Sequence, residues 1–172
     1  FGHIAKTLAQ RAKAFGMRVV VANRSPVHSA EVDQSFKLTD LHAFMASCDA
    51  VVVTLPLTDN TRSLVDAEAL SCMRPQALIV NVGRGEVINE ADLIAALKAK
   101  TIAGAALDVR AQEPPTKGEM ESIPNLILTP HVAGITKESQ LRINQILTAN
   151  IDLVLNAKPA THAVGALKES SN

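Results

Sequence analysis

The sequence predicts an α/β fold in which helices flank a doubly wound parallel sheet, and two features of the 172-residue chain lead to this prediction. Short runs of Val, Ile, Leu and Ala are almost continuously apolar, as in strands that are buried on both faces of a parallel sheet. Stretches with apolar residues at helical spacing separate these runs. Strands that alternate with helices form right-handed βαβ units, and repeated units build a doubly wound sheet.

Each predicted helix has a local signal. The first ends before Gly16, a residue that commonly terminates helices. The second follows a cap at Thr39 or Asp40, and Asn89 caps the fourth. The third stops at Arg74-Pro75, because the residue before a proline disfavours helical geometry. The predicted helices cover residues 4–15, 41–47, 66–73, 89 to about 98, and 137–156. The predicted strands cover residues 18–22, 50–55, 77–82, 103–109 and 126–129.

The composition excludes several classes of protein. Lys plus Arg equals Asp plus Glu, so the chain lacks the basic surplus that a general binder of nucleic acids or anionic membranes needs. No apolar run approaches ~18 residues and no signal peptide is visible, so we expect no membrane span. Cys48 and Cys72 lie outside any CxxC pattern, which favours a reduced, cytoplasmic setting, and nothing resembles a zinc site or another metal site.

The start of the chain has the chemistry of a phosphate-binding turn. The stretch Phe1-Gly2-His3-Ile4-Ala5 resembles the later part of G-x-G-x-x-G/A, with Gly2 at the middle glycine and Ala5 at the third small position. A helix that begins there presents free N–H groups to a pyrophosphate. The first glycine and its strand would lie upstream of residue 1. We therefore predict a dinucleotide-binding Rossmann domain that lacks its first strand in this sequence.

The segment Asn23-Arg24-Ser25 predicts which dinucleotide binds. It ends a strand 21 residues after Gly2, close to the spacing of about 20 at which such domains place the residue that reads the ribose. A carboxylate there would repel a 2′-phosphate, whereas the guanidinium of Arg24 suits one. We expect a preference for NADP(H), with NAD(H) possible. A solvated arginine at a strand end is the structural alternative.

Three further segments occur in order: VNVGRGEVINEADLIAAL (80–97), IAGAALDVRAQEPP (102–115) and LILTPHVAGIT (126–136). Together with the start of the chain they resemble the D-isomer-specific 2-hydroxyacid dehydrogenases, from Phe1 to about residue 157. The resemblance implies an enzyme that passes a hydride between a nicotinamide and C2 of a 2-oxo or 2-hydroxy acid. It also implies a catalytic Arg, Glu and His, which the motif positions assign to Arg84, Glu113 and His131.

These three residue types suit the reaction. Reduction of a ketone needs a proton on the oxygen, and His131 can supply it because imidazole titrates near neutral pH. Glu113 would orient the ring and favour its protonated form. Arg84 stays charged and would hold the substrate carboxylate and polarise the carbonyl. Taken one at a time, a loop arginine, a turn glutamate and a structural histidine are equally open interpretations.

The resemblance also implies cofactor contacts, which fall at or near the ends of strands. Asp108 would accept a hydrogen bond from the nicotinamide amide, and the cost of burying an unpaired carboxylate independently suggests a partner for it. Arg110 departs from the family, which usually has an aromatic residue there, so the pocket wall differs. The implied contacts are Gly2, His3, Ile4, Asn23, Arg24, Ser25, Thr54, Leu55, Pro56, Thr61, Val82, Gly83, Arg84, Asp108, His131 and Gly134.

The implied domain organisation has a dinucleotide-binding domain at 1–157. Residues 158–172 would return to a second, substrate domain or be disordered. Most of that substrate domain would lie outside this sequence, so we expect the chain alone to be inactive. Family members are commonly homodimers that act on small molecules.

Several functions stay open within this interpretation. The first is an NADP(H)-preferring reductase of the glyoxylate/hydroxypyruvate type, with a phosphoglycerate dehydrogenase as the alternative in the same class. The second is a non-enzymatic, nucleotide-sensing corepressor like the C-terminal binding proteins, which share the fold and a similar triad. Formate dehydrogenase is disfavoured, because it pairs its His with Gln where this chain has Glu113.

Overall fold

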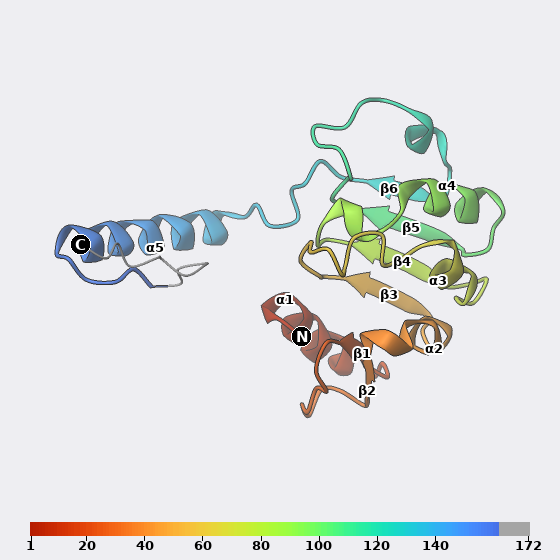
Figure 1. Cartoon of the computed structure of the whole chain (residues 1–172), viewed down its shortest axis with the longest axis horizontal. Coiled ribbons are helices and arrows are strands. Elements are labelled where there is room, and N and C mark those ends of the chain that lie inside the picture. Colours follow the sequence, from red (N-terminus) through yellow and green to blue (C-terminus); the bar gives the residue numbers. More distant parts are fainter. Residues whose placement is uncertain (162–172) are drawn as a thin grey trace. The chain divides into compact units, whose positions relative to one another are not determined.

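The computed structural model describes residues 1–161 (Figure 1). The chain divides into two compact units, Phe1–Ala133 and the part that begins at Gly134. Of the elements within residues 1–161, all six strands and four of the five α-helices lie in the first unit. We describe each unit by itself. The predicted boundary at residue 157 stays a prediction, and residues 162–172 of the segment predicted to follow it lie outside the described part.

The strands of the first unit form two parallel sheets. In the smaller sheet β1 (Val20–Asn23) pairs with β2 (Gln34–Lys37), and Asn23 lies opposite Lys37. The larger sheet has the order β3-β4-β5-β6. Its strands are β3 (Ala50–Val53), β4 (Leu78–Asn81), β5 (Gly104–Leu107) and β6 (Leu126–Leu128). Within residues 1–161 no strand joins β1 to β3, so the predicted sheet is interrupted between them.

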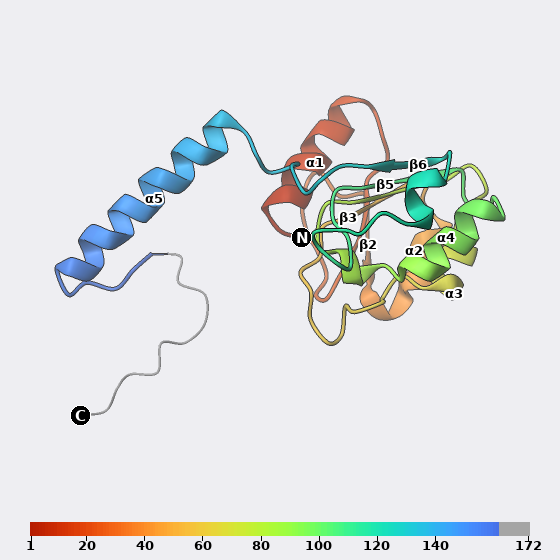
Figure 2. The same cartoon turned by 90° about the horizontal axis from the view of Figure 1, so that it is seen from above.

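Helices cover one face of the larger sheet. They are α2 (Leu41–Ala46), α3 (Ala67–Ser71) and α4 (Glu90–Lys98), and Figure 2 shows them gathered on the same side of the strands. Burial alternates along the strands as a pleated sheet requires: Val51 and Val53 are buried, whereas Val52 between them is exposed. The core therefore lies between this sheet face and the three helices.

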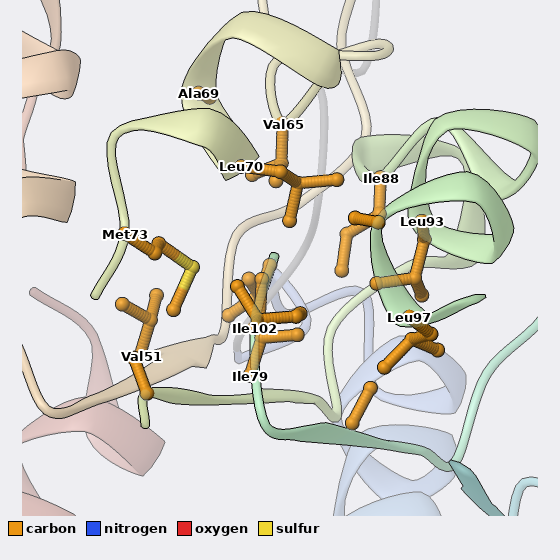
Figure 3. Packing of buried hydrophobic residues seen from close by; sticks show 14 of the residues in the cluster. Val51, Val65, Ala69, Leu70, Met73, Ile79, Ile88, Leu93, Leu97 and Ile102 are labelled. Carbon is orange, nitrogen blue, oxygen red and sulfur yellow. The ribbon is translucent and has the colours of Figure 1, made fainter. Parts of the chain in front are cut away.

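The core is aliphatic, as the near absence of aromatic residues predicts. Leu70 of α3 and Leu93 of α4 face Ile79 of β4, together with Ile102 just before β5 (Figure 3). Each of these four side chains has no solvent exposure. Complete burial of a Leu or Ile side chain stabilises a fold by roughly 1.5–3 kcal/mol, so this cluster anchors α3 and α4 to the sheet.

Of the two helix caps predicted from the sequence, the cap of α4 bonds as expected and the cap of α2 does not. Asn89 accepts hydrogen bonds from the N–H groups of Ala91 and Asp92 at the start of α4, and Asp66 accepts one from Ala69 at the start of α3. Asp40 precedes α2, but its side chain makes no cap hydrogen bond. The predicted helices and strands are confirmed, with ends that shift by a few residues. One strand was missed, since β2 has the sequence QSFK and lacks an apolar run.

The first helix of the chain and the last have different surroundings. Helix α1 (His3–Ala14) belongs to the first unit. Helix α5 (Lys137–Leu155) belongs to the second unit and begins at a capping box, in which Thr136 and Ser139 each accept the other's backbone N–H. Within residues 1–161, none of the helices combines the length and apolar character needed to cross a membrane.

Candidate active site

The loops that carry the predicted catalytic residues all follow strands of the larger sheet. Arg84 follows β4, Glu113 follows β5, and His131 follows β6. Because these strands are parallel, their carboxyl ends meet at one edge, where ligands bind in open α/β sheets. The three side chains line one pocket of about 230 Å³, together with Gly85, Glu86, Val109, Arg110 and Ala111.

A hydrogen bond joins the imidazole to the carboxylate. The Nδ1 of His131 lies 2.6 Å from Oε2 of Glu113. The other carboxylate oxygen, Oε1, accepts the backbone N–H of Arg110 at 2.9 Å. The Arg110 N–H and the bond to His131 together lower the pKa of the Glu113 carboxyl below its ordinary value. Glu113 is therefore ionised at neutral pH, and it favours a proton on Nδ1 while Nε2 is left for a ligand.

The backbone of His131 is held in an unusual conformation. Its φ is +55°, in the left-handed region that non-glycine residues rarely adopt and that costs on the order of 1 kcal/mol or more. Its N–H donates to the carbonyl of Asp108 at 2.8 Å. Strained residues of this kind gather at functional sites, where neighbouring contacts over-determine their geometry.

Asp108 supplies those contacts. Its buried carboxylate accepts hydrogen bonds from Thr129 Oγ1 at 2.6 Å and from the N–H groups of Val132 and Ala133, each at 2.9 Å. Burial alone would raise the pKa of Asp108, but the bonds from Thr129, Ala133 and Val132 outweigh it and lower the pKa. These internal partners account for the buried carboxylate, so its burial no longer points to a nicotinamide contact. That contact stays a prediction.

Arg84 is the exposed cation of the pocket. Its Nη1 donates to the carbonyl of Gly83, and among the described residues it forms no ion pair. The buried side chain of Asn81 fixes this loop, because it accepts the N–H of Gly83 and donates to the carbonyl of Arg84. The guanidinium is thus free to receive an anionic ligand.

Two glycines allow this loop to pack closely. A Cβ on Gly83 would lie 2.7 Å from the carbonyl oxygen of Leu55, in the loop after β3. A Cβ on Gly85 would lie 1.9 Å from the carbonyl carbon of Arg110. Gly83 and Gly85 therefore bring the Arg84 loop against the loops after β3 and β5, at distances that no side chain allows.

The predicted phosphate-binding residues occupy the start of α1 and the end of β1. Gly2 is the N-cap of α1 and provides no side-chain cap, so the first N–H groups of this 12-residue helix are open to an anion. Arg24 and Ser25 are exposed directly after β1. The side-chain N–H of Asn23 donates to the Ser25 carbonyl, and its Oδ1 accepts from the amino group of Phe1.

The remaining predicted contacts differ in their surroundings. Thr54 and Leu55 are half-buried after β3 and Pro56 is exposed, while Val82 is half-buried after β4. Thr61 is buried, and its hydroxyl donates to the Pro56 carbonyl and accepts the N–H of Thr58, so it pins this loop. His3 and Ile4 are exposed at the start of α1. Gly134 lies in the second unit, where its carbonyl accepts from Ser139.

The ion pairs of Arg110 were not predicted from the sequence. Arg110 was expected only to alter the pocket wall, yet it forms ion pairs with Glu90 at 3.1 Å and Glu121 at 3.4 Å. Glu90 lies 20 positions from Arg110 and Glu121 lies 11 positions from it, and no sequence periodicity or motif predicts ion pairs at these separations. The only signal was its departure from the family's usual residue.

Residues 1–133 match the family described as D-isomer specific 2-hydroxyacid dehydrogenase, NAD binding domain. A glycerate dehydrogenase of Methylorubrum extorquens is 36% identical over 162 residues, which cover 92% of this chain and 49% of the relative. A glyoxylate reductase of Pyrococcus furiosus is 36% identical over 151 residues, covering 88% and 45%. The chain spans about half the length of the relatives it matches.

Solved structures extend the likeness to the fold. A crystal structure of an NADPH-dependent glyoxylate/hydroxypyruvate reductase from Sinorhizobium meliloti, in complex with NADP and malonate, superposes with a TM-score of 0.88 at 31% identity. The match covers 95% of this chain and 50% of that one. A second such reductase from the same organism, in complex with NADP and sulfate, gives a TM-score of 0.84 at 27% identity and covers 95% and 53%.

Proposed function

Because the chain belongs to the D-isomer specific 2-hydroxyacid dehydrogenases, through their NAD binding domain, we propose that the protein transfers a hydride between NAD(P)H and a 2-oxo or 2-hydroxy acid. One observation carries this proposal: Arg84, Glu113 and His131 line a single pocket, and the imidazole is hydrogen-bonded to the carboxylate. The names of the relatives favour small substrates such as glyoxylate and hydroxypyruvate.

Each residue of the pocket has a defined task. His131 donates a proton from Nε2 to the carbonyl oxygen during reduction and removes it during oxidation. Glu113 holds the ring by Nδ1 and so directs Nε2 into the pocket. Arg84 binds the substrate carboxylate through its exposed guanidinium and draws electron density from the carbonyl. The reduced nicotinamide, when bound, supplies the hydride.

The open start of α1 fits a dinucleotide. Its N–H groups at His3, Ile4 and Ala5 lack a side-chain cap and would receive the pyrophosphate. Arg24 and Ser25 would receive a 2′-phosphate. Lys37 adds a positive charge opposite Asn23, at the carboxyl end of β2. This chemistry favours NADPH over NADH, and the NADP complexes of related structures support the same choice.

The catalytic assignment is tested by His131→Gln in the full-length protein. We expect at least a ~100-fold loss of kcat with glyoxylate or hydroxypyruvate, because a positioned acid–base group contributes that much or more. His42→Gln is the matched control, since His42 is exposed on α2. Near-normal turnover by His131→Gln would refute the assignment.

The cofactor preference is tested by kcat/KM with NADPH and with NADH. We expect kcat/KM to be higher with NADPH than with NADH. Arg24→Ala should reduce the ratio of kcat/KM for NADPH to that for NADH by about tenfold, through the loss of one charge-assisted contact. Arg11→Ala serves as the control, because Arg11 lies in the last turns of α1 and bonds to the carbonyl of Thr7. A clear NADH preference in the unaltered protein would overturn this part of the proposal.

A further inference from the structure

Arg110 is a mostly buried cation with two acidic partners. Its side chain is 13% exposed, and its Nε donates to Oε1 of Glu90 while its Nη1 lies 3.4 Å from Oε1 of Glu121. Both acids come from elements outside its own loop: Glu90 is the first residue of α4, and Glu121 lies in the 3₁₀ turn Glu119–Ser122. The guanidinium thus ties the loop after β5 to two other parts of the fold.

Glu90 also holds the backbone of this loop. The oxygen that accepts from Arg110 Nε accepts the N–H of Ala111 at 2.8 Å. Glu121 uses its second oxygen to accept the N–H of Gly118 at 2.7 Å. Arg110, Glu90 and Glu121 therefore form one charged network, which we term the Arg110 clamp, and it fixes the loop near both of its ends.

The clamp contacts the two loops that carry Glu113 and Arg84. The backbone N–H of Arg110 donates to Oε1 of Glu113, which leaves Oε2 for His131. On its other side, the carbonyl of Arg110 packs against Gly85, the neighbour of Arg84, where no Cβ could fit. A shift of the Arg110 backbone would move Glu113 away from His131 and disturb the support of Arg84.

We propose that Arg110 is a positioning residue, which acts through its clamp to hold Glu113 in hydrogen-bond contact with His131. This inference rests on the proposed function for its catalytic consequence. Its structural part, the contact between Glu113 and His131, can be measured separately. A guanidinium is suited to this place because it donates from Nε and Nη in a fixed plane, whereas an ammonium on a flexible stem is a single point charge.

Arg110→Met tests the proposal in the full-length protein. It keeps the length of the stem and removes the guanidinium. We expect kcat to fall roughly tenfold or more while KM changes less than about twofold, because small displacements of a catalytic group reduce turnover strongly. Arg110→Lys is expected to recover part of the lost kcat, since it restores the charge but not the planar pair of donors.

Lys98→Met is the matched control. Lys98 forms an ion pair with Glu119, which also joins α4 to the 3₁₀ turn but does not touch the loop from Arg110 to Glu113. We expect its kcat to stay within about twofold of the unaltered protein, because a surface ion pair contributes little. An equal loss of kcat in Lys98→Met and Arg110→Met would overturn the proposal, since the effect would then be one of general stability.

A crystal structure of Arg110→Met provides a readout that does not depend on activity. The proposal requires the 2.6 Å contact between Glu113 Oε2 and His131 Nδ1 to open beyond hydrogen-bond range. If the contact persists, Arg110 has no positioning role. If it opens while the unaltered protein reduces no 2-oxo acid, the positioning role stands and the proposed function fails.

Discussion

Asp108→Asn should separate the structural task of the buried carboxylate from any contact with a cofactor. The carboxylate accepts three hydrogen bonds from the His131 loop: one from the Thr129 hydroxyl and two from backbone N–H groups. An asparagine whose carbonyl takes the place of Oδ1 keeps two of these bonds in neutral form. Its NH₂ group then faces the N–H of Ala133, so that donor loses its acceptor.

The expected cost follows from these bonds. The lost bond to an ionised acceptor costs about 1–2 kcal/mol, because Ala133 is exposed and water can replace part of it. Each of the two remaining bonds loses the extra strength that an ionised acceptor provides, about 0.5–1 kcal/mol. We expect Asp108→Asn to lower the free energy of unfolding by about 2–4 kcal/mol at pH 7. Equilibrium urea unfolding followed by circular dichroism measures this difference. Asp59→Asn, at an exposed position, is the control and should change it by less than about 0.5 kcal/mol.

The pH dependence has a defined sign. The pKa of Asp108 is lowered in the folded protein, so its contribution is complete above the ordinary aspartate value of about 3.9 and is lost as the pH falls through the lowered folded-state pKa. The amide side chain of the Asp108→Asn variant does not titrate. The gap in stability between the two proteins should therefore narrow below about pH 4. A gap that is the same at about pH 7 and about pH 3, or smaller than about 0.5 kcal/mol at neutral pH, would refute the role assigned to the carboxylate.

Three other predictions concern the support of the site. Gly85→Ala should lower kcat at least about tenfold, because its Cβ would collide with the Arg110 backbone and separate two catalytic loops; unchanged steady-state kinetics would contradict this packing. Leu93→Ala should lower the free energy of unfolding by about 2–5 kcal/mol, because Leu93 is fully buried against the sheet, and urea unfolding measures it. Asn89→Ala should cost about 1 kcal/mol by the same measurement, since α4 loses its cap; no measurable change would show that the cap is dispensable.

The sequence predicted the fold where local patterns determine it. The apolar runs that became β3 and β4 mark buried strands, and Asn89 marks the start of α4. It missed β2, because Gln34–Lys37 pairs only at the edge of a two-stranded sheet and carries no apolar run. The interruption between β1 and β3 agrees with the predicted absence of the first strand of the domain.

The candidate site shows the same division. The order of the motifs predicted that Arg84, Glu113 and His131 act at one site, and in the structure they line one pocket. The partners of Asp108 could not be read from the sequence, because two of them are backbone N–H groups of residues that follow a different strand. The Arg110 clamp was hidden for a related reason: ion pairs between loops leave no periodic signal.

The buried polar residues of the described part explain how the site is held. Thr61, Asn81 and Asp108 are the polar residues buried in residues 1–161, and every buried side-chain N or O atom there has a hydrogen-bond partner. Such groups gain little net stability over apolar residues of similar size, because each must be desolvated. All three lie at or after the carboxyl ends of strands, and each bonds to a loop that carries predicted site residues. Replacement of any of them should therefore reduce turnover by a larger factor than an equally destabilising change in the apolar core, and Leu93→Ala provides that comparison.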